Sequence, residues 1–137
     1  MSDATPPIPW ELLTEKAREM ETKAYAPYSR YHVGAAGLTE DGRIILGCNV
    51  ENSSYGVTLC AECGVVSQLH ATGGGKFVAI VATGNGEVTL PCGRCRQVLA
   101  ENGGASLLVA CPDGEKRSLE ELLPGLVESF NDKSYQG

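Results

Sequence analysis

Hydrophobic and polar residues follow a helical period at the start of the chain and a strand period soon after it. The apolar positions of the first segment recur three or four residues apart: Trp10, Leu13, Ala17, Met20 and Ala24. This spacing predicts an opening helix with Pro9 in its first turn, and Pro27 is expected to end it. Residues 31–52 then hold two strand-like runs around a Glu40-Asp41-Gly42 turn, which is typical of a β-hairpin.

The rest of the chain alternates between helical and strand segments. Residues 60–72 predict a helix that ends at three glycines (73–75), and residues 76–84 form an almost wholly apolar strand, typical of a sheet covered on both faces. A further helix is expected over 92–104, a strand over 105–111 and a short helix over 118–124. The order β-β-α-β-α-β-α after the first helix predicts an α/β fold: a mixed sheet between helices, in a three-layer sandwich.

Composition and charge narrow the class of protein. The 137 residues, 42% hydrophobic and 20% charged, predict one folded domain over 1–137. The net charge of −6 argues against nucleic acid and favours a small molecule or a protein as partner. The first ten residues lack the basic and apolar regions of a signal peptide, and no apolar run approaches the ~18 residues of a membrane span. We therefore expect a cytoplasmic protein that does not contact membranes.

Four of the six cysteines form two C-x-x-C pairs, Cys60 with Cys63 and Cys92 with Cys95. In a cytoplasmic protein such pairs are typical of metal ligands or buried thiols rather than disulfides. Each pair lies at the start of a predicted helix, where free N–H groups stabilise thiolates and where α/β sheets form ligand crevices. Thiolates from both helices are therefore expected to meet at one metal, and zinc suits this ligand set best.

Glu62, inside the first pair, distinguishes two kinds of zinc site. Four cysteine ligands would make a closed structural site in which Glu62 has no function. Three ligands, Cys60, Cys92 and Cys95, would leave one position for a water molecule whose pKa the metal lowers from ~15.7 toward ~7. That water needs a neighbouring group to accept and pass on its proton, and Glu62 is placed for this task.

The pattern C-x-E followed by P-C-x-x-C is the zinc deaminase signature with cysteine as its first ligand. With this signature the chain resembles the small, homotetrameric, three-cysteine cytidine deaminases. The resemblance covers most of the chain, through the blocks "YAPYSRYHVGAA", "GCNVENSSYG", "CAE", "PCGRCRQVL" and "ELLP". It implies a five-stranded mixed sheet in the three-layer sandwich, one zinc ion per subunit, and a homotetramer.

The resemblance also implies the reaction, which is the hydrolysis of cytidine and deoxycytidine to their uracil counterparts and ammonia in pyrimidine salvage. Zinc-activated water would attack C4 of the cytosine ring while Glu62 moves protons to N3 and to the leaving amino group. The substrate contacts that the resemblance implies are the ribose ligands Asn49 and Glu51, the backbone of Ala61 at the pyrimidine, and Tyr31, Tyr55 and Phe130.

This chain departs from the family pattern at three places, two of which are among these substrate contacts. Tyr31 lies where the family usually has phenylalanine, and Phe130 lies three residues beyond the usual C-terminal aromatic position. Many relatives have arginine directly after "CAE", where this chain has Cys63. We therefore hypothesise that Arg94, between Cys92 and Cys95, supplies the positive charge that offsets the thiolates.

Three alternatives stay open at this point. Deaminases of the nucleoside antibiotic blasticidin S share "PCGRCRQVL", although "NVENSSYG" is closer to the cytidine enzymes. A cytosine deaminase acting on nucleic acid is disfavoured by the acidic charge. A non-catalytic four-cysteine zinc module is the alternative from a different functional class.

Overall fold

The computed structural model describes residues 7–129 and has a mixed β-sheet at its centre. Its six strands are β1 (Val33–Thr39), β2 (Ile44–Cys48), β3 (Phe77–Gly84), β4 (Glu87–Thr89), β5 (Leu108–Ala110) and β6 (Lys116–Ser118). Five of them follow the order β2-β1-β3-β5-β6, and β4 pairs with β3. The β3–β5 pair is parallel and the others are antiparallel.

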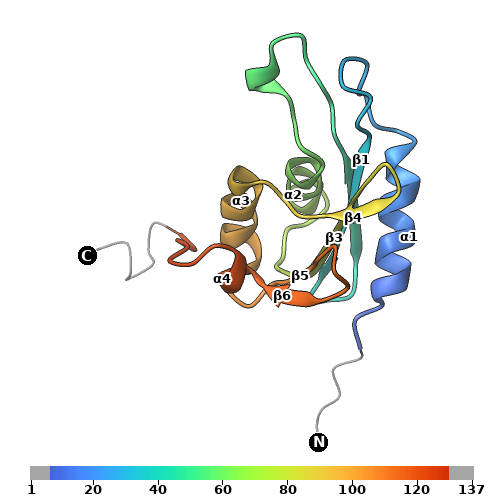
Figure 1. Cartoon of the computed structure of the whole chain (residues 1–137). Helices are drawn as coiled ribbons and strands as arrows, with labels where there is room; N and C mark the ends of the chain where they lie inside the picture. Colours follow the sequence, from blue (N-terminus) through green and yellow to red (C-terminus); the bar gives the residue numbers. More distant parts are fainter. Residues whose placement is uncertain (1–6, 130–137) are drawn as a thin grey trace, which may run out of the picture.

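Helices cover both faces of this sheet, so the predicted three-layer α/β/α sandwich is confirmed. Helix α1 (Trp10–Glu21) lies on one face, and α2 (Ala61–Ala71) and α3 (Gly93–Gly103) lie on the other (Figure 1). A short helix, α4 (Leu119–Leu122), follows β6, and a 3-10 turn, η1 (Tyr55–Val57), lies in the connection from β2 to α2.

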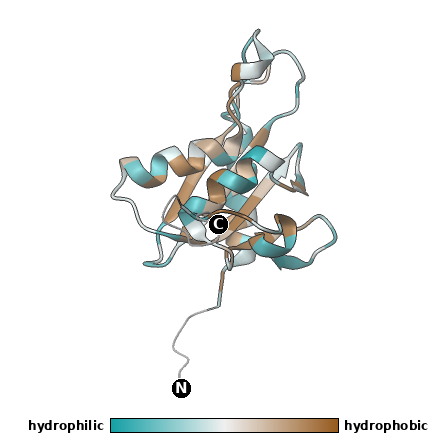
Figure 2. Cartoon of the chain, turned by 90° about the vertical axis from the view of Figure 1, so that its left-hand side faces the viewer, coloured by the Kyte–Doolittle hydropathy of each residue, from teal (hydrophilic) through white to brown (hydrophobic). Residues whose placement is uncertain are grey.

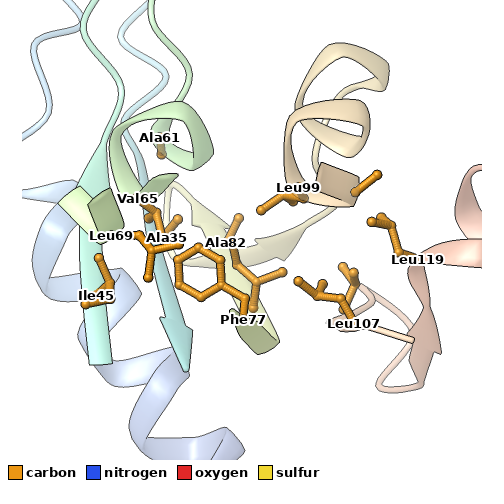
Figure 3. Close-up of a cluster of buried hydrophobic side chains, with 13 residues drawn as sticks. Ala35, Ile45, Ala61, Val65, Leu69, Phe77, Ala82, Leu99, Leu107 and Leu119 are labelled. Carbon is orange, nitrogen blue, oxygen red and sulfur yellow. The ribbon is translucent and has the colours of Figure 1, made fainter. Parts of the chain in front are cut away.

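The side chains of the strands alternate between two hydrophobic clusters, as the two-residue period of a strand requires. Ala36, Ala79 and Val81 pack with α1 in one cluster. Ala35, Ile80 and Ala82 pack with α2 and α3 in the other. Figure 3 shows Phe77 in the middle of this second cluster, and Figure 2 shows hydrophobic residues concentrated on the strands.

Helix α1 ends earlier than the sequence predicts. It stops at Glu21, the Thr22 side chain bonds back to the Glu19 carbonyl, and Ala24 lies outside the helix. The chain leaves the helix because Tyr25 forms a bridge with Val50: the Tyr25 amide donates to the Asn49 carbonyl. A long-range backbone pairing therefore ends the helix before Pro27 is reached.

The sheet contains six strands, where the family resemblance implies five. The two strands that the hydrophobic pattern does not predict are β4 and β6, each of three residues with no buried side chain. Both hold their places by backbone pairing, β4 on β3 and β6 on β5.

Two loops, residues 22–32 and 49–60, extend beyond the layers at one end of the molecule (Figure 1). They carry most of the large hydrophobic side chains that are exposed: Tyr25, Tyr28, Tyr31, Val50, Tyr55, Val57 and Leu59. We call this set the loop patch. No helix within residues 7–129 is long and apolar enough to cross a membrane.

Candidate metal and active site

Three cysteine sulfurs gather where the N-termini of α2 and α3 meet. The Sγ atoms of Cys60, Cys92 and Cys95 all lie within 4.8 Å of one another, and those of Cys60 and Cys92 are 4.0 Å apart. Cys60 is the N-cap residue of α2 and Cys92 that of α3, so each helix contributes a sulfur at its positive end. The structure therefore brings the three predicted ligands together.

The three thiols differ in environment. Cys95 is fully buried, and this burial together with the nearby Glu62 carboxylate raises the pKa of its thiol. Burial also raises the pKa of the Cys60 thiol. Partial desolvation also opposes ionisation of Cys92, the exposed member of the cluster. Hydrogen bonds from the Cys95 backbone amide, from the Cys95 and Cys60 thiols and from the Arg94 amide outweigh this effect and lower the pKa of the Cys92 thiol. A divalent cation would favour the thiolate form of all three and release their protons on binding.

The donor set fits zinc. Tetrahedral coordination with Zn–S bonds of ~2.3 Å places two sulfur ligands about 3.8 Å apart, close to the separations in this cluster. Soft thiolates on helix N-termini suit Zn²⁺ better than Mg²⁺ or Ca²⁺, which take oxygen ligands. The residues that would hold the ion are Cys60, Cys92 and Cys95.

Glu62 lies in the first turn of α2 with only 5% of its surface exposed. Burial raises the pKa of its carboxyl group, and hydrogen bonds from its own backbone amide and from the Cys95 side chain partly offset this effect. A buried carboxyl group with a raised pKa exchanges protons closer to neutral pH, which suits a general acid–base residue.

Cys63 lies beside this cluster but is not one of its members. Its Sγ atom is 4.0 Å from that of Cys95, yet it does not belong to the group of mutually close sulfurs. The described part of the chain includes all six cysteines, and none of them forms a disulfide.

Arg94 approaches the cluster from the exposed side. Its Nη2 atom donates to the Thr58 carbonyl at 3.1 Å and lies 3.8 Å from the Cys60 sulfur. The Cys60 thiol beside it raises the pKa of the guanidinium, with smaller contributions from Cys63 and Cys95. The contact is the one that the charge-compensation hypothesis requires.

A cavity of about 210 Å³ opens next to the cysteines. Predicted site residues that line it are Tyr31, Asn49, Cys60, Ala61, Glu62 and Cys92. Thr58, Leu59, Thr89, Leu90 and Val33 complete its wall. Thr89 and Leu90 were not among the predicted site residues, although their position just before Pro91-Cys92 is a signal that could have identified them.

Asn49 and Glu51 hold the loop that forms one wall of the cavity. The Asn49 side chain accepts from the Val33 amide and donates to the Tyr31 carbonyl, both at 2.9 Å. The buried Glu51 carboxylate accepts from the Tyr28 amide at 3.0 Å and from the Ser29 amide and hydroxyl, and it does not line the cavity. The Ser29 hydroxyl leads the interactions that lower the pKa of Glu51.

The structure places Tyr55, another predicted contact, away from the cavity. Tyr55 is 65% exposed on the loop patch, where its ring meets that of Tyr28 edge-on at 6.4 Å. Phe130 lies outside the described residues. Within residues 7–129, neither Tyr55 nor Glu51 borders the cavity of this single chain.

Comparisons with known proteins show that this chain is similar to cytidine deaminases. Residues 9–111 match the family model described as the cytidine and deoxycytidylate deaminase zinc-binding region. A curated cytidine deaminase of Mycobacterium tuberculosis is 54% identical over 120 residues, which cover 87% of this chain and 90% of that protein.

Solved structures agree with the family match. The crystal structure of cytidine deaminase from M. tuberculosis is similar with a TM-score of 0.85 at 52% identity, covering 88% of this chain and 98% of that one. The crystal structure of cytidine deaminase from Mycobacterium leprae gives 0.84 at 48%, covering 86% and 99%.

Proposed function

The chain belongs to the cytidine and deoxycytidylate deaminase family, and from this premise we propose that it hydrolyses cytidine and deoxycytidine to uridine and deoxyuridine with release of ammonia. The observation that carries the proposal is the buried Glu62 beside three mutually close cysteines at the edge of a cavity. A structural zinc module has no use for a buried carboxyl group at that position.

Cys60, Cys92 and Cys95 hold the zinc ion in this proposal. Bound zinc lowers the pKa of a water molecule and so supplies the nucleophile for C4 of the cytosine ring. Arg94 faces the Cys60 sulfur and offsets the surplus negative charge of three thiolates around one divalent cation.

Glu62 moves the protons. Its carboxylate accepts one proton of the attacking water and delivers it to N3 of the pyrimidine. It then takes the remaining proton from the new C4 hydroxyl group and passes it to the amino group, so that the C4 oxygen becomes the carbonyl as ammonia leaves. Because burial raises the pKa of Glu62, the protonated form that this sequence needs costs less free energy near neutral pH.

The cavity receives the base and the sugar. We assign the pyrimidine to the backbone of Ala61 and to the Tyr31 wall, both of which line the cavity. For Asn49 and Glu51 to bind the ribose hydroxyls, their hydrogen bonds to loop residues 28–33 must be shared or exchanged on binding. Tyr55 and Phe130 are proposed to act at the site of a neighbouring subunit.

A homotetramer is the proposed assembly. The loop patch exposes seven large hydrophobic residues beside the cavity, and such patches mark interaction surfaces. The cavity of one chain is smaller than the ~300–1,000 Å³ of typical ligand pockets, which supports a site completed by a second copy. Light scattering coupled to gel filtration should give four times the mass of the chain, and a monomer that turns over cytidine would contradict this assembly.

The cellular setting is proposed to be pyrimidine salvage in the cytoplasm. Six unpaired cysteines, three of them gathered at a candidate metal site, suit a reducing compartment.

The test follows ultraviolet absorbance with cytidine, deoxycytidine, cytosine and blasticidin S in parallel, with zinc measured on the same samples. We expect turnover of the first two, one zinc per chain, and a loss of about 10²–10⁴-fold in kcat for Glu62→Gln with zinc retained. Turnover of blasticidin S without turnover of cytidine or deoxycytidine would identify the antibiotic as the substrate instead. Zinc binding without any turnover, unaffected by Glu62→Gln, would favour the structural module.

A further inference from the structure

Arg96 connects two segments that are far apart in the sequence. Its side chain extends from α3, directly after Cys95, and donates from Nε to the Pro91 carbonyl at 2.9 Å and from Nη1 to the Leu122 carbonyl at 2.8 Å. Pro91 immediately precedes Cys92, and Leu122 is the last residue of α4. One half-buried guanidinium therefore touches both the turn that carries a zinc ligand and the end of α4.

Cys92 is the ligand that most needs such support. Cys95 is fully buried and is held by packing, whereas Cys92 is exposed. The direction of its side chain must therefore be set by its backbone. The Pro91 carbonyl and the Cys92 nitrogen belong to one rigid peptide plane, so a hydrogen bond to that carbonyl fixes the plane from which the Cys92 side chain departs. Pro91 has no N–H group through which the turn could be anchored instead.

The second contact sets the start of the C-terminal segment. After Leu122 the chain returns along α3, where the Gln97 side chain donates to the Val127 carbonyl at 2.7 Å. Farther along, the Glu128 carboxylate accepts from the Ala105 amide. Figure 1 shows α4 beside α3, in line with these contacts. Arg96 therefore holds the end of α4, from which this segment begins.

We propose that Arg96 is a positioning residue that is anchored on the end of α4 and holds the exposed ligand Cys92 in its metal-binding orientation. The inference rests on the zinc site of the proposed function. Arginine suits this role because its planar fork presents donors to two carbonyls at once, while lysine is a single point donor on a flexible stem.

The experiment measures zinc affinity in the full chain by competition with a chromogenic chelator, for the wild type, Arg96→Lys and Arg96→Gln. Residues that orient metal ligands typically contribute 10–100-fold to metal affinity, so we expect both variants to bind zinc about 10–100-fold more weakly. The thiolate-to-metal absorption bands of the Co²⁺-substituted protein should also shift. The matched control is Gln97→Ala, which removes only the contact to Val127 and should leave zinc affinity and the cobalt spectrum unchanged.

Two results would overturn the proposal. The first is an Arg96→Lys or Arg96→Gln protein that is folded by circular dichroism and has wild-type zinc affinity and cobalt bands. The second is an equal loss in Gln97→Ala, which would assign the effect to the C-terminal segment alone. Neither measurement uses a substrate, so both stand even if the chain proves inactive on cytidine.

Discussion

Gly47 controls how closely the metal-binding helix approaches the sheet, and replacing it with alanine should displace that helix. A Cβ atom at Gly47 would lie 2.6 Å from the Ala61 carbonyl oxygen and 2.6 Å from the Val65 nitrogen. Both atoms belong to the backbone of α2, so no side-chain rotation can relieve the clash. Since Gly47 is in β2 and paired with Ala35, the strand is also fixed from its other side.

The size of the displacement follows from the contact distances. An ordinary contact of a Cβ atom begins at 3.4 Å, so the helix backbone must retreat by about 0.8 Å from 2.6 Å. Ala61 lies between Cys60 and Glu62, and a misplacement near 1 Å in an active site costs about 10²-fold in rate. Overpacking of this kind costs typically 1–3 kcal/mol of stability. We therefore expect Gly47→Ala to lower kcat/KM by about one to two orders of magnitude and to lower Tm.

Gly64 provides the matched control, because it faces the same strand from α2. A Cβ atom there has no neighbour nearer than 3.6 Å, and alanine is favoured over glycine in helix interiors by ~1 kcal/mol. Gly64→Ala should keep wild-type kcat/KM and raise Tm. Steady-state kinetics, zinc content and thermal unfolding of both variants test the reasoning. Wild-type activity and Tm in Gly47→Ala would refute it, and so would equal losses in the two variants.

Four further predictions concern the site and its support. Cys63→Ala should retain one zinc per chain and turnover, and loss of the metal on purification would instead identify a fourth ligand. Arg94→Ala should weaken zinc binding in chelator competition, and an unchanged affinity would dispose of the charge-compensation hypothesis. In the zinc-free chain, the raised pKa of Glu62 means that this residue binds more protons in the folded state than in the unfolded state. The free energy of unfolding should therefore fall as the pH rises above 4.5, the ordinary pKa of Glu62, and urea titrations of Glu62→Gln should not show this fall. Leu69→Ala, at a fully buried position facing Phe77 across the core, should cost about 2–5 kcal/mol in the same titrations, and a cost below 1 kcal/mol would mean that the core repacks.

Elements defined by local signals were predictable from the sequence. Helix α2 begins directly after Cys60 and ends before Gly73, close to the predicted limits, because caps and glycines act on their immediate neighbours. The end of α1 was not predictable, because the pairing of Tyr25 with Val50 depends on a strand far along the chain. Strand β6 was not predicted because its sequence, Lys116 to Ser118, has no hydrophobic alternation. The strand forms through its backbone pairing with β5.

The site residues also divide into those that local spacing predicts and those whose contacts depend on the fold. Spacing within one helix start brings Cys60 and Glu62 together, so the local motif predicts the grouping. The partners of Asn49 and Glu51 are set by the fold of loop 28–33, and no spacing rule gives them. Arg96 was missed for a related reason: its two acceptors are backbone carbonyls, and a carbonyl carries no signal in the sequence.

The position of Cys63 bears on whether three or four cysteines bind the metal. The cavity is lined by Cys60, Cys92 and Glu62, whereas neither Cys95 nor Cys63 borders it. Cys63 lies 4.0 Å from the buried Cys95 and outside the group of mutually close sulfurs. A water molecule or substrate that enters the cavity therefore meets two of the proposed ligands and the carboxylate, but not the Cys63 thiol. This arrangement favours Cys60, Cys92 and Cys95 as the residues that would hold the metal. An ion with three thiolate ligands would keep one coordination position for water, which is the condition that hydrolytic deamination requires.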